Sequence, residues 1–182
     1  MKTPGEIPEV KFHDGFDPSQ LQYGWGVGGY NEKRKGMYTA PQYENRRNIH
    51  MGIDIWAPAG EPVYAPADGE LVYQTNNDET GNYGPTIVLK HDLPNGPVYA
   101  LYGHLSVASL DLHQTGDKIS AGDPVGWLGD YDENGGWIPH LHYQISTKDP
   151  GEADMPGVVS DKEHARAFEL YPDPEKVFGT IC

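Results

Sequence analysis

Short runs of β-branched and aromatic residues follow one another between residues 49 and 147, each bounded by Gly, Pro, Asn or Asp. This pattern is typical of strands. We predict strands at residues 52–56, 62–65, 70–74, 86–91, 98–102, 124–128 and 141–146. Pro94-Asn95-Gly96 is a hairpin signal, because Asn and Gly tolerate positive φ. The close spacing leaves no room for crossover helices, so we expect an all-β, mainly antiparallel, sandwich-like core.

The pattern changes on both sides of this region. Residues 1–48 are polar, aromatic and Gly-rich, which predicts a wrapping segment with one strand near 22–27 and a solvated loop at 32–35. Near the other end, Ser160 and Glu163 form a capping-box pattern, which predicts a short helix from about 161 to 170, ended by Pro172. We therefore expect one globular domain made of an N-terminal wrapping segment (1–48), a core (49–147) and a C-terminal extension (148–182).

Composition and charge narrow the possible partners. The 182 residues suffice for one core, and 23 Gly and 16 Pro agree with many short strands. The net charge of -14 argues against a nucleic-acid partner, which requires a basic surface. Cys182 is the sole cysteine, so neither an internal disulfide nor a thiolate metal site is expected.

No stretch approaches the ~20 apolar residues of a membrane span. The first residues lack the apolar run of a signal peptide. The expected location is therefore the cytoplasm, or the periplasm or exterior if a leader has been removed.

Four of the eight histidines occur in patterns that carry chemistry, whereas His13, His91, His113 and His164 are isolated and expected to be polar surface. His140 and His142 are two apart on a predicted strand, which places both on one face about 6.6 Å apart. Two imidazoles so placed can converge on one small site.

His50 and Asp54 supply a further imidazole and a carboxylate, and both groups are standard zinc ligands. In a straight strand they would lie about 13 Å apart, too far to share an ion. A shared site therefore requires a bend or bulge near Gly52. His104 follows a predicted strand and precedes a loop, where a rigidly held side chain can reach a cleft.

Together these residues predict a zinc ion held by two histidines and Asp54, with a fourth position open for water. An open position is typical of catalytic zinc, which lowers the pKa of bound water to about 7 and polarises a carbonyl. The remaining imidazoles titrate in the range needed to move protons. Spacing alone does not decide whether His140 or His142 binds the ion.

The same motifs resemble a known family. Residues 50–69 read HMGIDIWAPAGEPVYAPADG, 102–106 read YGHLS, 116–129 read GDKISAGDPVGWLG and 139–145 read PHLHYQI. These four motifs closely resemble those of the M23 peptidases, the lysostaphin-like or LytM-like zinc metallopeptidases.

The resemblance implies an antiparallel β core of the duplicated hybrid motif or lysostaphin-like kind, with a groove floored by a zinc site. It implies that His50, Asp54 and His142 bind Zn²⁺, and that His104 and His140 assist catalysis. The implied activity is endopeptidase cleavage of stem or cross-link peptides in peptidoglycan.

Some features of the sequence depart from the pattern of that family. Residues 131–138 replace a stretch of small residues, and Trp137 is expected to narrow the groove. Residues 75–83 and 107–115 are expected to form its variable walls.

Three alternatives remain at this point. They are a non-catalytic LytM-like activator module, a carbohydrate- or peptide-binding module, and a phosphocarrier domain of a sugar phosphotransferase system. A phosphocarrier is disfavoured because the Asp54 carboxylate would repel phosphate. The scissile bond and the oligomeric state stay open.

Overall fold

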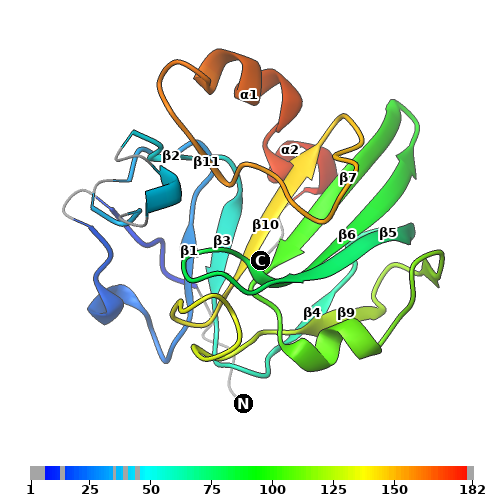
Figure 1. Cartoon of the computed structure of the whole chain (residues 1–182), viewed down its shortest axis with the longest axis horizontal. Coiled ribbons are helices and arrows are strands. Elements are labelled where there is room, and N and C mark those ends of the chain that lie inside the picture. The colour runs from blue at the N-terminus through cyan, green and yellow to red at the C-terminus, as the bar shows by residue number, and fades with distance from the viewer. Residues whose placement is uncertain (1–6, 13–14, 35, 39–40, 44–45, 180–182) are drawn as a thin grey trace.

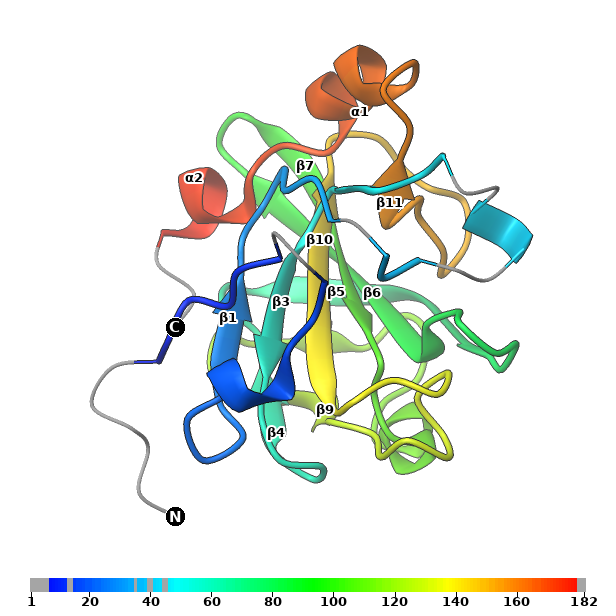
Figure 2. The same cartoon turned by 90° about the vertical axis from the view of Figure 1, so that its left-hand side faces the viewer.

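A large antiparallel sheet is the main feature of the computed structural model, which describes residues 7–12, 15–34, 36–38, 41–43 and 46–179 (Figure 1). Within these residues the sheet has seven strands, in the order β1-β3-β10-β7-β6-β5-β8. Two small ribbons, β4 with β9 and β2 with β11, accompany it. Figure 2 shows β1, β3 and β10 side by side, with β10 near the middle of the sheet.

The strands and helices have the following bounds. The strands are β1 (Gly26–Gly28), β2 (Ile49–His50), β3 (Ile53–Trp56), β4 (Pro62–Tyr64), β5 (Gly69–Asn77), β6 (Gly84–Leu93), β7 (Gly96–Gly103), β8 (Lys118–Ile119), β9 (Pro124–Trp127), β10 (His140–Ser146) and β11 (Val158–Val159). The α-helices are α1 (His164–Leu170) and α2 (Pro174–Phe178), and the 3-10 helices are η1 (Pro18–Gln20), η2 (Pro41–Tyr43) and η3 (Val107–Asp111).

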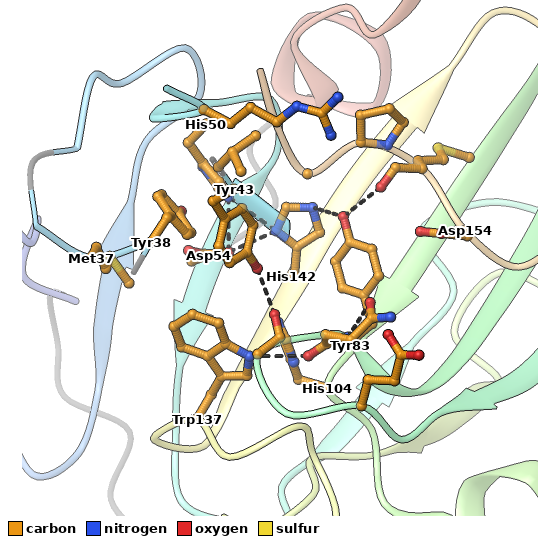
Figure 3. A pocket seen from close by; sticks show the side chains of 18 of the residues that line it. Met37, Tyr38, Tyr43, His50, Asp54, Tyr83, His104, Trp137, His142 and Asp154 are labelled. Carbon is orange, nitrogen blue, oxygen red and sulfur yellow. Dashed lines mark hydrogen bonds and ion pairs between the residues drawn. The ribbon is translucent and has the colours of Figure 1, made fainter. Parts of the chain in front are cut away.

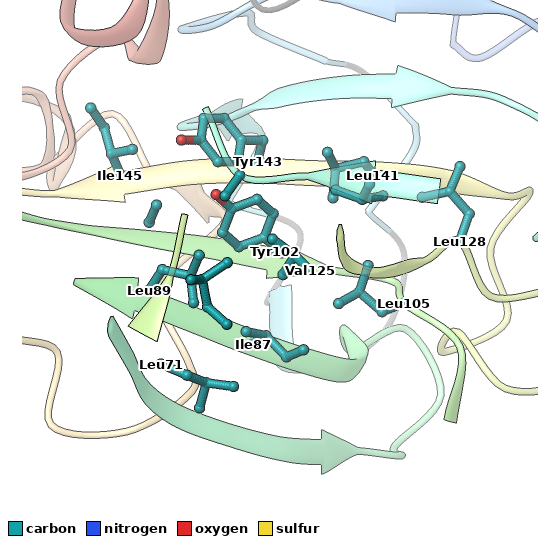
Figure 4. Packing of buried hydrophobic residues seen from close by; sticks show 14 of the residues in the cluster. Leu71, Ile87, Leu89, Tyr102, Leu105, Val125, Leu128, Leu141, Tyr143 and Ile145 are labelled. Carbon is teal, nitrogen blue, oxygen red and sulfur yellow. The ribbon is translucent and has the colours of Figure 1, made fainter. Parts of the chain in front are cut away.

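Strand β10 separates the core of the molecule from its polar site. Successive side chains of a strand point to opposite faces. Leu141, Tyr143 and Ile145 therefore enter the main hydrophobic cluster (Figure 4), and His140 and His142 point to the other face. The cluster also takes buried residues from the β4–β9 ribbon, namely Val63 and Val125. The sheet thus buries one face in the core and presents histidines on the other.

The predicted antiparallel β fold is confirmed, and a strand overlaps each of the seven predicted core runs. The predicted hairpin is also present, since β6 and β7 meet at the Leu93–Gly96 pair and Gly96 has φ 116°. Helix α1 begins at His164, three residues later than expected, although the backbone N–H and hydroxyl of Ser160 both donate to Glu163 Oε2. Helix α2 and the short strands β2, β8 and β11 were not predicted.

Two expectations about polar surface are wrong. Arg34, in the stretch expected to be a solvated loop, is completely buried. His91 is also completely buried, with Nδ1 2.9 Å from the carbonyl oxygen of Asp68 and its ring against Phe178. His13 and Cys182 lie outside the described residues. No helix in the described part of the chain is long and apolar enough to cross a membrane.

The bend expected near Gly52 is present, because β2 ends at His50 and β3 begins at Ile53. A Cβ on Gly52 would lie 2.7 Å from Cε1 of His142 and 2.8 Å from the carbonyl oxygen of Tyr143. The glycine therefore permits the close approach of the His142 ring at this change of direction.

We expect Gly52→Ala to lower the free energy of unfolding by about 1–3 kcal/mol, because the added methyl overlaps a backbone oxygen and a packed ring. Urea unfolding of the purified protein measures this. Gly29→Ala is the matched control, since its Cβ would meet only the Glu32 side chain, at 3.6 Å. Equal stability of the two variants would contradict the steric role given to Gly52.

Candidate metal centre

Three buried side chains from three strands converge on one point (Figure 3). His50 ends β2, Asp54 lies in β3 and His142 lies in β10, where the sheet register pairs it with Asp54. His50 Nε2 is 3.0 Å from His142 Nδ1, and Asp54 Oδ1 is 3.2 Å from the former and 3.1 Å from the latter. Their residues are only 1%, 2% and 4% exposed, in the order His50, Asp54 and His142.

Neighbouring acceptors determine which nitrogen of each ring faces this point. His50 Nδ1 lies 3.3 Å from the carbonyl oxygen of Gly29, and His142 Nε2 lies 3.0 Å from Oε1 of Gln144. Since these oxygens accept, the outer nitrogens carry the protons in the neutral rings. The inner nitrogens then present lone pairs toward the carboxylate oxygen of Asp54.

Three lone pairs at this separation repel one another unless a cation lies between them. A tetrahedral zinc with bonds of about 2.0–2.2 Å separates its ligand atoms by roughly 3.3–3.6 Å. The observed distances of 3.0, 3.1 and 3.2 Å are close to that range. Two imidazoles and one carboxylate are also a common donor set of catalytic zinc, so these residues fit the metal.

The electrostatics favour the forms that bind metal. Burial, with a smaller contribution from the Arg34 guanidinium, lowers the pKa of His50 to about 4. Burial opposes ionisation of Asp54, but the His50 imidazole and the Arg34 guanidinium outweigh it and hold the pKa of this carboxyl well below its usual value. His50 is therefore neutral and Asp54 ionised at pH 7, as metal binding requires.

His104 and His140 lie beside this triad, with ring centroids 4.3 Å apart. His104 Nδ1 is 2.9 Å from the carbonyl oxygen of Asn134, and His140 Nδ1 is 2.7 Å from that of Ile138. These contacts leave Nε2 of each neutral ring unprotonated and able to accept a proton, and that of His140 lies 3.9 Å from Oδ1 of Asp54. Burial lowers the pKa of both rings. The Trp56 ring also stacks on His140 at 5.4 Å.

The backbone of His104 is strained, because its φ is 64° in the left-handed region that favours glycine. Its N–H donates to the carbonyl of Tyr83 at 2.8 Å, and the following N–H of Leu105 donates to that of Pro85. Residues held in such conformations persist where the surroundings fix them, and they cluster at functional sites.

All five residues face a cavity of about 480 Å³. Its walls come from residues 79 and 81–83, from the segment around Asp154 and from Trp137, whose Nε1 donates to the carbonyl of Asn82 at 3.0 Å. The expected wall at 75–83 is thus present in part, and Trp137 lines the cavity as expected. Residues 107–115, all of them described, contribute nothing to the lining, so that expectation was wrong.

Three residues that serve this site were missed in the sequence. Gln144 continues the two-residue period of His140 and His142, and this signal could have identified it. Asn134 is buried and its backbone carbonyl accepts from His104. Arg34 contacts Asp54 from a distant segment, and no local pattern indicates it.

The chain belongs to peptidase family M23, whose sequence profile matches residues 48–154. The DD-carboxypeptidase/endopeptidase Mpg of Neisseria meningitidis serogroup B is 38% identical over 134 residues, which are 66% of this chain and 28% of that protein. The peptidoglycan DD-endopeptidase ShyC of Vibrio cholerae is 31% identical over 115 residues, which are 61% of this chain and 24% of that protein. The matches thus span about a quarter of these relatives' lengths.

A solved structure supports the fold. The catalytic domain of the antimicrobial peptidase lysostaphin from Staphylococcus simulans aligns with a TM-score of 0.51 at 22% identity, over 78% of this chain and 92% of that one. The fold is therefore lysostaphin-like, as the sequence predicted.

We expect acid to destabilise the metal-free protein through His50. The unfolded residue takes up its proton near pH 6.5 and the folded one only near 4, so between these values the unfolded state binds more protons. The contribution of neutral His50 to the free energy of unfolding is complete above pH 6.5, and it falls by on the order of 2 kcal/mol by pH 5. Urea unfolding with a chelator at pH 7 and pH 5 measures it. His50→Gln should lose less stability over this interval, and an equal loss would contradict the assignment.

Proposed function

We propose that this protein is a zinc-dependent endopeptidase in which His50, Asp54 and His142 hold the metal. The observation that carries the proposal is the convergence of one atom from each of these three side chains, at distances of 3.0–3.2 Å from one another. Gly29 and Gln144 fix the tautomers of the His50 and His142 rings. Ordered outer partners of this kind are typical of metal-binding histidines. When bound, Zn²⁺ would polarise the carbonyl of a peptide bond and make hydroxide available near neutral pH.

His104 and His140 are proposed to move the protons of the reaction. Peptide hydrolysis removes a proton from the attacking water and adds one to the leaving amine. Each ring has its Nδ1 bound to a backbone carbonyl, and its Nε2 is free to exchange a proton. Because burial lowers both pKa values, both rings start neutral at pH 7. Their separation of 4.3 Å allows one substrate group to reach either ring.

The proposed substrate is a stem or cross-link peptide of peptidoglycan. The matched relatives bear the names of a peptidoglycan DD-endopeptidase and a DD-carboxypeptidase/endopeptidase. The aromatic walls formed by Tyr38, Tyr43 and Trp137 suit an extended peptide. A non-catalytic activator module would not need the free Nε2 atoms of His104 and His140, so the enzyme is favoured.

Asp54→Asn and His142→Ala should each abolish stoichiometric zinc binding, because each removes a ligand atom of the triad. Metal analysis after dialysis against a weak chelator measures the loss. His164→Ala is the control, since that ring lies away from the cavity and contacts Asn31. Full zinc content in the Asp54 or His142 variants would exclude this metal site.

His104→Ala should keep its zinc but lower turnover by about 10²- to 10⁴-fold, the usual loss for a general acid or base. The assay is digestion of peptidoglycan and cross-linked muropeptides, with new amino termini identified by mass spectrometry. Loss of metal in this variant would show that His104 is a ligand instead. No cleavage by the zinc-loaded unmodified protein would rule out the proposed substrate.

A further inference from the structure

Arg34 reaches the candidate metal centre from outside the region that the family profile matches. The profile covers residues 48–154, whereas Arg34 lies in the N-terminal segment. Its side chain is completely buried, and Nη1 lies 2.5 Å from Oδ2 of Asp54. The other carboxylate oxygen, Oδ1, faces His50 and His142. The two oxygens of Asp54 therefore have separate partners.

The guanidinium is held from several sides. Nε and Nη2 donate to Oε2 of Glu32 at 3.2 and 3.1 Å, and Nη1 also donates to the Tyr38 hydroxyl at 3.2 Å. The Phe12 ring lies beneath it, with its centroid 4.1 Å from Cζ. A Cβ on Gly28 would lie 2.6 Å from Nη2, so that glycine leaves room for the group. The guanidinium is thus fixed in position by contacts within the protein.

The backbone of this segment is fastened to the strand that carries His50. The N–H of Arg34 donates to the carbonyl of Asn48, and the N–H of His50 donates to that of Glu32, each at 2.8 Å. Lys33 and Ile49 form an isolated antiparallel bridge. Movement of Arg34 is therefore coupled to movement of His50.

The charges show which effect of Arg34 should dominate. A cation near the metal would by itself weaken metal binding by repulsion. Glu32 lies against the same guanidinium and offsets its charge. The remaining effect of Arg34 is on the orientation of the Asp54 carboxylate, because a planar guanidinium binds a carboxylate in a fixed geometry and a point charge does not.

We propose that Arg34 is a positioning residue of the metal centre, binding Oδ2 of Asp54 so that Oδ1 alone is presented to the ion. This inference rests on the proposed function. It makes the N-terminal segment a structural part of the metal site. A purely structural ion pair would instead support folding and leave the metal affinity of the folded protein unchanged.

The test is the zinc dissociation constant of the full chain, measured by competition with a chromophoric chelator. Arg34→Met should raise this constant about 10- to 100-fold, the usual effect of removing an outer partner of a metal ligand. The visible spectrum of the Co²⁺-loaded variant should also change, because the coordination of Asp54 changes. Lys33→Met is the matched control: it removes one positive charge from the same segment, but that lysine pairs with exposed Asp161. It should match the unmodified protein in both readouts.

Arg34→Lys keeps the test decisive if the methionine variant does not fold. It retains the buried charge but has a single nitrogen, which cannot hold Asp54 and Glu32 as the fork does, so its dissociation constant should also rise. Unchanged zinc affinity and Co²⁺ spectrum in either folded variant would overturn the inference alone. Failure of the unmodified protein to bind zinc would overturn the proposed function and this inference with it.

Discussion

The pairing of β10 with β3 is the interaction on which the site depends. It sets His142 opposite Asp54, while Leu141 and Tyr143 enter the core on the other face. Because side chains alternate, a slip of one residue would turn the histidines into the core and the apolar residues toward the cavity. Burying Leu141 and Tyr143 therefore fixes the register, and the register places the side chains of Asp54 and His142 side by side. The packing of the core and the geometry of the candidate metal centre are thus two consequences of one strand pairing.

The same arrangement requires polar groups to be buried, which destabilises the fold unless each has a partner. Backbone carbonyls supply much of what is needed, since those of Gly29, Ile138 and Asn134 accept from three different histidines. All three acceptors lie in loops, outside the strands that carry the rings. The loops around the cavity consequently do more than shape it, because they also determine the tautomers on which the proposed metal binding and proton transfer depend.

Much of the sheet could be predicted because its strands are encoded by local alternation and bounded by turn residues. The bend at Gly52 could be predicted from a distance argument, since the side chains of His50 and Asp54, four residues apart, cannot reach one ion from a straight strand. Arg34 could not be found in this way. Its neighbours in sequence are charged, and the partners that make its burial tolerable include Asn48 and Asp54, which lie far from it in the chain. His91 was missed for a similar reason, because Phe178 covers it from a distant helix.

Chemistry and specificity are carried by different parts of this molecule. The proposed ligand atoms belong mainly to the large sheet, whereas the cavity walls are loops joined to one another by hydrogen bonds. The Tyr43 hydroxyl donates to the carbonyl of Gly81, and Trp137 donates to that of Asn82. Changes in these loops can alter the shape of the cavity without moving β3 or β10. The sheet therefore carries the proposed metal centre, while the loops of this chain shape the access to it. Arg34 is the exception, because it joins the N-terminal segment directly to Asp54 in the sheet.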